Sequence, residues 1–572
     1  MIILAGISIS ALSGENNIIK KAGQAADETK LAAYKDEISL SSIGSIDESG
    51  KNNIEKVKQQ LDNTEKYNTS ILGDTLVIIT KKENYVFEIN QDGDIQFKGI
   101  KIDITNAEPL MMRYNSAEAF WKEEYRTKIS KVEIKNYITT SQKAIKEWDV
   151  SYKHNQSVMA WIEDDGNDGY VLYIAANGKI KMINAYSNSL FAGFTNLTKI
   201  NAANLDITSI ANLWLTFKDC SKLERIDLSA WDTSNITSMT GMFQNCTNLK
   251  SISLNGLNTD KVQSINKMFA GCTSLSEINF GDFKTDNVTD MSEMFSGCTS
   301  LKTIDLSSLN TSKVENMNSL FNGCTSLHTI DISKLNTKSA KKMSWMFNGC
   351  TNLSNIKQCD FDISNVTEIR AMFQNCDKLE HFDLNIKNTG NVQNMSDLFN
   401  SCDNLKSVKI SNWDTKSVTN MSSMFFDCKS LEGTLDFSKW NISNVENFSS
   451  MFFECKKINK IIISGKNEKA TSVGAMFQGC WAKEIDISGI TCQHVQSVRC
   501  MFHNWGIPNI EEPRKIDISS MTFENITDYS HFIQDGYGSK DIIYVKDMAG
   551  QDFVVNQNIR FTTENVIIKT NE

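Results

Sequence analysis

The sequence predicts an α/β solenoid of about 13 coils of 26 residues, with a strand-rich N-terminal cap and an N-terminal helix. Three observations indicate the repeat. Cysteine recurs every 26 residues from Cys220 to Cys428, and Cys455 and Cys480 continue the series. A phenylalanine lies three residues before each of these cysteines, and a short apolar pattern of the form LxxIxL follows them. Coils of this kind bury their apolar side chains only against neighbouring coils, so we expect one continuous stack.

Residues 301–324, LKTIDLSSLNTSKVENMNSLFNGC, represent one coil. The first part alternates apolar and polar residues, which predicts a short strand with one buried face. Turn-forming residues follow at 310–312. The remaining apolar residues then fall at helical intervals, so the second side of the coil is expected to be a short helix or helical turn: Val314, Met317, Leu320, Phe321 and Cys324.

Two longer segments carry a family resemblance. DTSNITSMTGMFQNCTNLKSISL (232–254) and WDTKSVTNMSSMFFDCKSLEGTLDF (413–437) resemble the BspA-type leucine-rich repeats of bacterial surface proteins. The resemblance implies a right-handed leucine-rich repeat solenoid over residues 186–535. It also implies a surface protein of a class that is often adhesive, and it names no ligand.

The regular cysteines are predicted to be free, buried thiols that act as small apolar side chains. Equivalent residues of stacked coils lie about 4.8 Å apart, a separation that would also permit disulfides. Cys359, Cys492 and Cys500 lie outside the series, and the spacing of Cys492 and Cys500 is compatible with a local disulfide. No Cys or His spacing predicts a zinc or other metal site. The predicted ladder comprises Cys220, Cys246, Cys272, Cys298, Cys324, Cys350, Cys376, Cys402, Cys428, Cys455 and Cys480.

A polar row is predicted on the strand face, between the last two apolar residues of each strand. It is mostly acidic, with small polar residues two positions later. One interpretation is a solvated face whose side chains bond their neighbours, and the other is a ligand-binding surface. Serine and lysine interrupt the row, so a regular calcium cage is disfavoured. The candidate ligand-binding residues of this row are Asp227, Asp305, Asp331, Asp383, Asp436 and Asp486.

Trp345 is a further candidate for ligand contact, because it replaces small or polar residues of the other coils on the exposed side of the predicted helical segment. Trp231, Trp413 and Trp440 instead share a position that other coils fill with Leu or Phe, which predicts burial in the core. Irregular copies near 357–361, 433, 466–469 and 506–514 are candidates for loops that carry specificity.

Residues 1–40 begin with a short apolar run and continue as a charged helical pattern. The segment LAGISISALSGENNIIKKA resembles the second half of the N-terminal helix of type IV pilin-like proteins. The resemblance implies association with pilin-type assembly components, and contact with a membrane only through this helix. An ordinary amphipathic helix is the alternative.

The rest of the N-terminal region is predicted to be strand-rich. Residues 41–105 are expected to hold a linker and a small β-meander, and residues 106–185 a mixed, strand-rich cap with a helix at AFWKEEYRTKIS. The acidic stretch EDDGNDG lacks the spacing of an EF-hand and predicts a hairpin turn. Residues 536–572 are expected to cap the other end of the array.

The functional prediction is a recognition or adhesion protein at the bacterial cell surface, binding a protein or glycan on host or neighbouring cells. The alternative is a structural pilus-associated or surface-layer component that binds other bacterial subunits. A net charge of -10 without a long basic run argues against nucleic acid as a partner. The chain has no GxSxG, HExxH, Walker A or GxGxxG motif, so neither an enzyme nor a cofactor is predicted.

Overall fold

The computed structural model describes residues 28–43, 45–46, 51–72, 74–101, 121–139, 141, 143–153, 155–182, 188–357, 361–504, 513–534, 540–558 and 560–569. The chain divides into two compact units, one of Met1–Ser238 with Cys246–Lys261 and the other of Met239–Asn245 with Val262–Glu572. The pilin-like segment, residues 4–22, lies outside the described residues.

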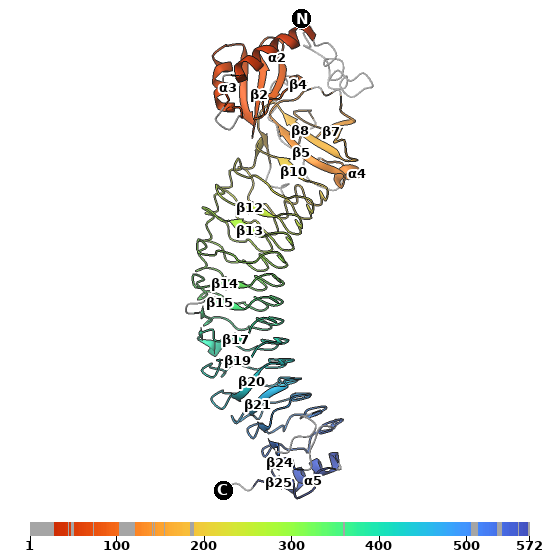
Figure 1. Cartoon of the computed structure of the whole chain (residues 1–572), viewed down its shortest axis with the longest axis vertical. Helices are drawn as coiled ribbons and strands as arrows, with labels where there is room; N and C mark the ends of the chain where they lie inside the picture. The colour runs from red at the N-terminus through yellow and green to blue at the C-terminus, as the bar shows by residue number, and fades with distance from the viewer. Residues whose placement is uncertain are drawn as a thin grey trace. The chain divides into compact units, whose positions relative to one another are not determined.

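Two helices pack against an antiparallel four-stranded meander at the start of the first unit (Figure 1). Ile38 of the first helix, Val57 of the second and Phe87 of the sheet are fully buried in one cluster. The stretch before the meander, predicted as a linker, therefore contains a helix that covers the sheet. The elements are α2 (Glu28–Ile43), α3 (Ile54–Asp62), β1 (Tyr67–Leu72), β2 (Thr75–Thr80), β3 (Tyr85–Ile89) and β4 (Ile95–Ile100).

A five-stranded sheet follows, in the order β10-β5-β8-β7-β6. Its strand β10 belongs to the first repeat coil and pairs in parallel with β5, with Lys199 opposite Lys131. The sheet therefore covers and hydrogen-bonds the first coil, as a cap does. Its elements are α4 (Glu123–Arg126), β5 (Ile129–Lys135), β6 (Lys146–Asp149), β7 (Val158–Asp164), β8 (Tyr170–Ala176), β9 (Ile180–Lys181), β10 (Lys199–Asn201) and β11 (Leu205–Asp206).

Two details of this cap bear on the sequence predictions. The helix expected at AFWKEEYRTKIS is limited to the four residues of α4, because β5 begins three residues later. The EDDGNDG stretch forms the turn between β7 and β8. Asp165 Oδ1 accepts the backbone N–H groups of Asn167 at 2.7 Å and Gly169 at 3.0 Å, so the carboxylate stabilises a hairpin.

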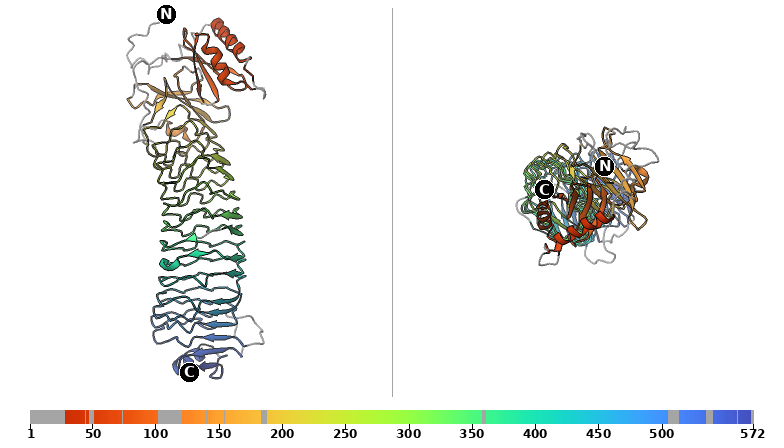
Figure 2. Two further views of the ribbon diagram at one scale, coloured as in Figure 1. Left: turned by 90° about the vertical axis from the view of Figure 1, so that its left-hand side faces the viewer. Right: turned by 90° about the horizontal axis from the view of Figure 1, so that it is seen from above.

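The coils of the second unit stack with their short strands parallel and in register (Figure 2). In one pair, Ile330 lies opposite Ile356, one coil later. Strand β12 (Ser251–Ser253) belongs to the first unit. Those of the second are β13 (Glu277–Asn279), β14 (Thr329–Asp331), β15 (Asn355–Lys357), β16 (Phe361–Asp362), β17 (His381–Phe382), β18 (Ile386–Lys387), β19 (Ser407–Val408), β20 (Glu432–Asp436), β21 (Lys457–Ile462), β22 (Glu484–Asp486) and β23 (Lys515–Asp517).

The second side of the coil is not helical, so that sequence prediction is wrong. No α-helix occurs among the described residues from 188 to 534. Residues 315–324, and their equivalents in other coils, form what we call the turn side. Here alternate N–H groups donate to the next coil, from Met317 to the carbonyl of Lys342 at 2.9 Å and from Ser319 to that of Ser344 at 2.9 Å.

Left-handed backbone explains why a helix cannot form on the turn side. Ser319 has φ 55° and Gly323 has φ 72°, and both interrupt the right-handed helical conformation. Three-residue turns connect these positions, as in the bond from Asn322 N–H to the carbonyl of Ser319 at 3.1 Å. Consecutive turns of three residues repeat apolar side chains at nearly the interval of a helix, which accounts for the misleading sequence pattern.

Phenylalanine rings stack through the core at the repeat spacing. The rings of Phe295 and Phe321 have centroids 5.5 Å apart, and those of Phe321 and Phe347 are 5.7 Å apart, with interplanar angles of 10° and 6°. Each ring is fully buried. Offset stacking adds about 0.5–1.5 kcal/mol per pair to the burial of apolar area, so this column links successive coils energetically.

The C-terminal elements continue the repeat sheet. Strands β24 (Ile542–Val545) and β25 (Val566–Ile568) extend the parallel order from β20 through β23, and α5 (Met548–Gln557) lies between them in sequence. Phe553 of this helix stacks on Phe523 with centroids 4.3 Å apart. A buried ion pair joins Arg514 to Asp541 at 2.5 Å, with both side chains 3% exposed. The region predicted as a C-terminal cap thus supplies further strands and a covering helix.

We expect Phe321→Ala to destabilise the protein by about 3–5 kcal/mol, because it removes a fully buried ring and leaves its two stacking partners beside a cavity. Urea unfolding followed by circular dichroism measures the loss. Ser319→Ala is the control, since Ala475 already occupies the equivalent left-handed position. Equal stability of the two variants would contradict a structural role for the phenylalanine column.

Candidate functional site

The predicted acidic row has a structural role at one corner of each coil. One carboxylate oxygen accepts the backbone N–H two residues later, at 2.8 Å for Asp227, 2.9 Å for Asp305, Asp331 and Asp436, and 3.0 Å for Asp486. This is the bonding of an Asx turn, and the serine two positions later can add a side-chain bond, as Ser488 Oγ does to Asp486 Oδ1 at 2.6 Å. The structure thus places these carboxylates singly, one per coil.

The outer carboxylate oxygens are open to solvent or paired with lysine. Asp331 accepts Lys357 Nζ at 2.7 Å, and Lys409 Nζ lies 4.0 Å from Asp383. Lys357 and then Ser333 hold the pKa of the Asp331 carboxyl well below its usual range. Hydrogen bonds from Ser307 lower the pKa of Asp305, and those from Ser438 lower that of Asp436. The carboxylates of Asp305, Asp331 and Asp436 therefore remain charged at neutral pH, and ligand binding by the row stays a prediction.

Ion pairs between coils balance much of the remaining surface charge. Lys250 pairs with Glu224 at 3.0 Å, and Lys341 with Glu315 at 2.8 Å, each across one coil boundary. Lys406 and Glu380 form a similar pair at 2.6 Å. Exposed pairs of this kind stabilise a protein by about 0–1 kcal/mol. As a result, positive and negative side chains alternate on this surface, and no large patch carries charge of a single sign at these pairs.

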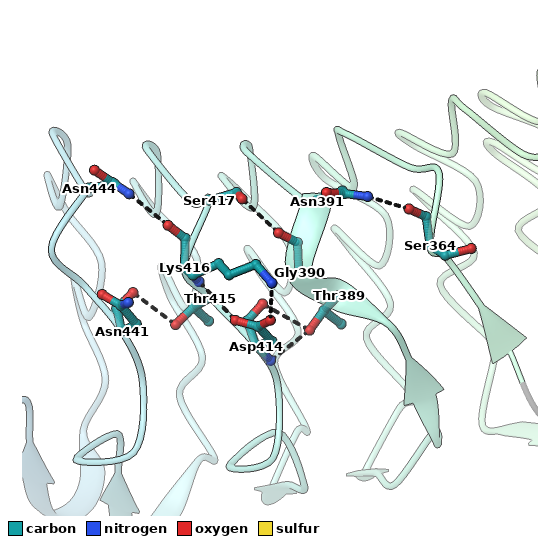
Figure 3. A network of polar contacts seen from close by, with 10 residues as sticks. All are labelled: Ser364, Thr389, Gly390, Asn391, Asp414, Thr415, Lys416, Ser417, Asn441 and Asn444. Carbon is teal, nitrogen blue, oxygen red and sulfur yellow. Dashed lines mark hydrogen bonds and ion pairs between the residues drawn. The ribbon is translucent and has the colours of Figure 1, made fainter.

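Polar corners of successive coils are bonded through buried threonines (Figure 3). Thr389 Oγ1 donates to the carbonyl of Asp414 at 3.0 Å, and Thr415 Oγ1 donates to that of Asn441 at 3.0 Å. Outside them, Asn444 Nδ2 donates to the carbonyl of Lys416 at 2.7 Å. The polar residues at this corner therefore satisfy the backbone, and they leave few donors for a ligand.

A shallow polar hollow lies beside this corner, where 386–391 depart from the usual coil as β18 and the 3-10 helix η3 (Thr389–Asn391). Asn388, Gly390 and Asp414 line it. A side chain at Gly390 would meet Asp414 Oδ2 at 2.6 Å, so glycine is required for the carboxylate to occupy its place. Sequence analysis missed this hollow, and the available signal was Gly390, at a position that other coils fill with a polar side chain such as Asp286, Ser312 or Lys416.

The regular cysteines are free thiols and fully buried. Each of the first ten donates its S–H to the backbone carbonyl of a core phenylalanine in the preceding coil, for example Cys324 to Phe295 and Cys350 to Phe321, both at 3.1 Å. Burial raises the pKa of Cys324 to about 12. Cys492 and Cys500 are also free, so no disulfide joins them. Cys359 lies outside the described residues.

The tryptophans divide into two environments. Trp231 and Trp440 are 3% exposed, and their indole N–H groups donate to backbone carbonyls at 3.2 and 3.1 Å. Trp413 is 4% exposed, so all three belong to the core. Trp345 lies half-buried on the turn side, with the Arg370 guanidinium 5.5 Å from its ring centroid. It is therefore less exposed than expected, because a cation from the next coil covers it.

The irregular copies differ in kind. A β-bulge lies between Gly433 and Thr434, where glycine takes φ 78°. In the copy at 466–469, Asn467 is fully buried and donates to the carbonyls of Ile442 at 2.6 Å and Val445 at 2.8 Å. Both irregularities are thus accommodated structurally. Residues 358–360 and 505–512 lie outside the described residues.

Within the described ranges, no three His, Cys, Asp or Glu side chains gather as metal ligands. A search of the same residues finds no helix of the length and apolarity that a membrane crossing requires.

Stacked coils, inter-coil hydrogen bonds and open polar surfaces define a solenoid repeat protein. The profile of the family described as "Mycoplasma protein of unknown function, DUF285" matches residues 185–301, 275–386, 372–490 and 436–541. These overlapping matches cover more than half of the chain, which therefore belongs to this family. They fall on the segments that resemble BspA-type leucine-rich repeats, and they support that interpretation.

Two solved structures show limited similarity. A leucine-rich repeat protein from Eubacterium ventriosum is 15% identical, with 56% of this chain and 91% of that chain covered at a TM-score of 0.25. The Toll–Spatzle complex of Drosophila is 12% identical, with 85% of this chain and 68% of that chain covered at a TM-score of 0.20. Neither value supports a functional comparison. No curated protein matches the chain.

Thiol accessibility provides a test of the cysteine assignment. We expect a maleimide to label Cys500, which is half-buried, before any ladder cysteine in the native protein. Because burial raises the pKa of Cys324, Cys402 and Cys480 to about 12, raising the pH from neutral to mildly alkaline should not expose their thiolates. Peptide mass spectrometry measures the order of labelling. Labelling of the ladder in folded protein would contradict its burial.

The acidic corners predict a loss of stability in acid. Hydrogen bonds lower the folded-state pKa of Asp305 and Asp331, so both contribute stability above the unfolded value of about 4 and lose it as the pH falls below that value. The melting temperature should therefore decline from neutral pH to pH ~3. The decline should be smaller in the double variant Asp305→Asn, Asp331→Asn. Identical pH profiles would contradict the contribution of these carboxylates.

Proposed function

We propose that this protein is a recognition protein of the bacterial cell surface, which binds a protein or glycan on host or neighbouring cells. The observation that supports the proposal is the separation of roles within each coil. Core phenylalanines, buried thiols and threonines hold the coils together, while the outward rows differ from coil to coil without affecting that framework. Such a framework suits extended binding surfaces.

The arrangement of acidic side chains favours binding over catalysis. General acid–base chemistry needs two groups placed together with different protonation states. Here each carboxylate is engaged in its own Asx turn, and hydrogen bonds lower the pKa of Asp305, Asp331 and Asp436 alike, so none of these three is set apart as a general acid. We therefore propose no catalytic residue and no cofactor.

A second proposal, association with pilin-type assembly components, draws on the N-terminal part of the first unit. Helix α2, which follows the pilin-like segment in the sequence, buries Ile38 against the β1–β4 meander. This helix therefore belongs to a folded module of helices on a sheet. In this proposal the module holds the protein in a surface assembly. It is compatible with recognition by the repeat coils.

Binding of the labelled full-length chain to host cells, neighbouring bacteria and extracellular matrix tests the recognition function. We expect saturable binding, and about a tenfold weaker apparent affinity in Asp305→Asn, Asp331→Asn if the strand face makes the contact. Asparagine preserves the Asx turn, as Asn279 shows by accepting the N–H of Gly281 at 3.1 Å. The double variant should therefore remain folded.

The matched control is Asp232→Asn, Asp290→Asn, which removes the same charge at other corners where asparagine is also found, as at Asn310 and Asn316. Saturable binding unchanged in both double variants would place the contact elsewhere on the coils. A folded chain that binds no cell or matrix would contradict recognition. Recovery of pilin-type subunits by crosslinking in that case would support the assembly role.

A further inference from the structure

The geometry points to a binding site for an acidic glycan on the turn side of the second unit, centred on Trp345 and Arg370. The inference rests on the proposed recognition function and gives it a surface and a ligand class. The ligand is an oligosaccharide that carries a carboxylate, as sialic and uronic acids do. Four observations support this assignment.

The first observation is that the indole of Trp345 is not needed by the fold. Trp345 occupies the first left-handed position of the turn side, with φ 58°. Ala371 and Ala475 occupy the same position in other coils with φ 52° and 53°, and Ser319 with φ 55°. A small side chain therefore suffices there, and a large aromatic residue held at the surface calls for another explanation.

The second observation is the orientation of Arg370. Several other coils place serine at this position, for example Ser344 and Ser396. The Arg370 guanidinium stacks over Trp345, and its Nε lies 3.3 Å from Asp397 Oδ2. No other group of the described chain bonds its terminal nitrogens. The outer edge of a guanidinium fixed in this way presents two parallel N–H groups, the geometry that binds a carboxylate in a bidentate manner.

The third observation is a row of side-chain amides beside this pair. Asn348 Nδ2 donates to Asn322 Oδ1 at 2.8 Å, whereas the Gln374 side chain bonds no described residue. Amides both donate and accept hydrogen bonds, as hydroxyl groups require. Successive coils place them about 4.8 Å apart, similar to the advance of one pyranose ring in a linear glycan. The row comprises Asn322, Asn348, Gln374 and Asn400, all half-buried.

The fourth observation is an aromatic pair that continues the amide row. Phe426 and Phe453 are half-buried and stack with centroids 4.5 Å apart and an interplanar angle of 4°. Other coils place polar residues at this position, such as Asn400 and Gln478. Aromatic side chains thus lie beside the polar row, at Trp345, and at its far end, at Phe426 and Phe453, which offers apolar contacts to a sugar chain.

Charge distinguishes an acidic glycan from an acidic protein at this surface. A polyanionic peptide would require several unpaired cations, but nearby Lys341 is paired with Glu315 at 2.8 Å. The chain as a whole carries a net charge of -10. One guanidinium with adjacent amides therefore suits a ligand with isolated carboxylates and many hydroxyl groups.

Calorimetric titration of the full-length chain with sialyllactose, a hyaluronan oligosaccharide, lactose and a polyglutamate peptide tests the inference. We expect saturable binding of at least one of the two acidic sugars, and no binding of lactose or polyglutamate. Arg370→Gln should weaken that binding about tenfold or more, since a bidentate contact to a charged group is lost. Arg370→Lys should lose a similar amount, because lysine cannot reproduce the two parallel donors.

Two controls separate binding from folding. Arg499→Gln removes an arginine from the equivalent position of a later coil, where Ala475 stands in place of Trp345, and should leave affinity unchanged. Trp345→Ala should melt as the parent does, because alanine is native at this position in other coils, yet bind the acidic sugar at least about tenfold more weakly.

Absence of binding to both acidic sugars would overturn the inference, as would equal binding of polyglutamate or full affinity in Arg370→Gln. Cell-binding experiments distinguish an error in this site from an error in the proposed recognition function. Cell binding that survives both Arg370→Gln and Trp345→Ala would overturn this site alone. Absence of any cell binding by the unaltered chain would overturn the recognition function itself.

Discussion

Hydrogen bonding between successive coils is the interaction on which the rest of this structure depends. On the turn side, alternate backbone N–H groups donate to the coil that follows, as in the bond from Phe321 to the carbonyl of Met346 at 2.9 Å. These bonds require every coil to repeat the same backbone path at the same spacing. Left-handed residues such as Ser319 and Trp345 are tolerated because this ladder offsets their conformational cost of about 1–3 kcal/mol each.

The same constraint divides side chains into those that must repeat and those that are free to vary. Phe321 must repeat because its ring stacks on Phe295 and Phe347, and Cys324 because its buried thiol donates to the carbonyl of Phe295 in the preceding coil. Outward positions on the turn side, such as that of Ser319, Trp345 and Ala371, hold different side chains with no such partner in common. Function in a solenoid of this kind is therefore found where an outward position departs from its column, and not where the column is regular.

Much of the framework follows from sequence, since inward residues alternate visibly and recur at one interval. The strands and the buried cysteines are examples. The burial of Trp231 is another, and the structure adds that its indole N–H donates to a backbone carbonyl. The sequence predicts a helix on the turn side because consecutive three-residue turns and an α-helix repeat apolar residues at nearly the same interval. Only the φ values of residues such as Ser319 and Gly323 separate the two, and those depend on bonds to a different coil.

The environment of Trp345 shows why the site was harder to predict than the fold. Sequence comparison among coils identifies Trp345 as a departure from its column, but it does not identify its partners. Arg370 and Asp397 are 25 and 52 residues further along the chain. Arg370 covers the indole and Asp397 holds Arg370 only because the inter-coil bonds keep three coils in register. The acidic row gave a clearer sequence signal, yet its regularity arises from turn formation. In this protein a repeated polar residue is evidence of architecture, whereas an isolated one that a neighbouring coil orients is better evidence of recognition.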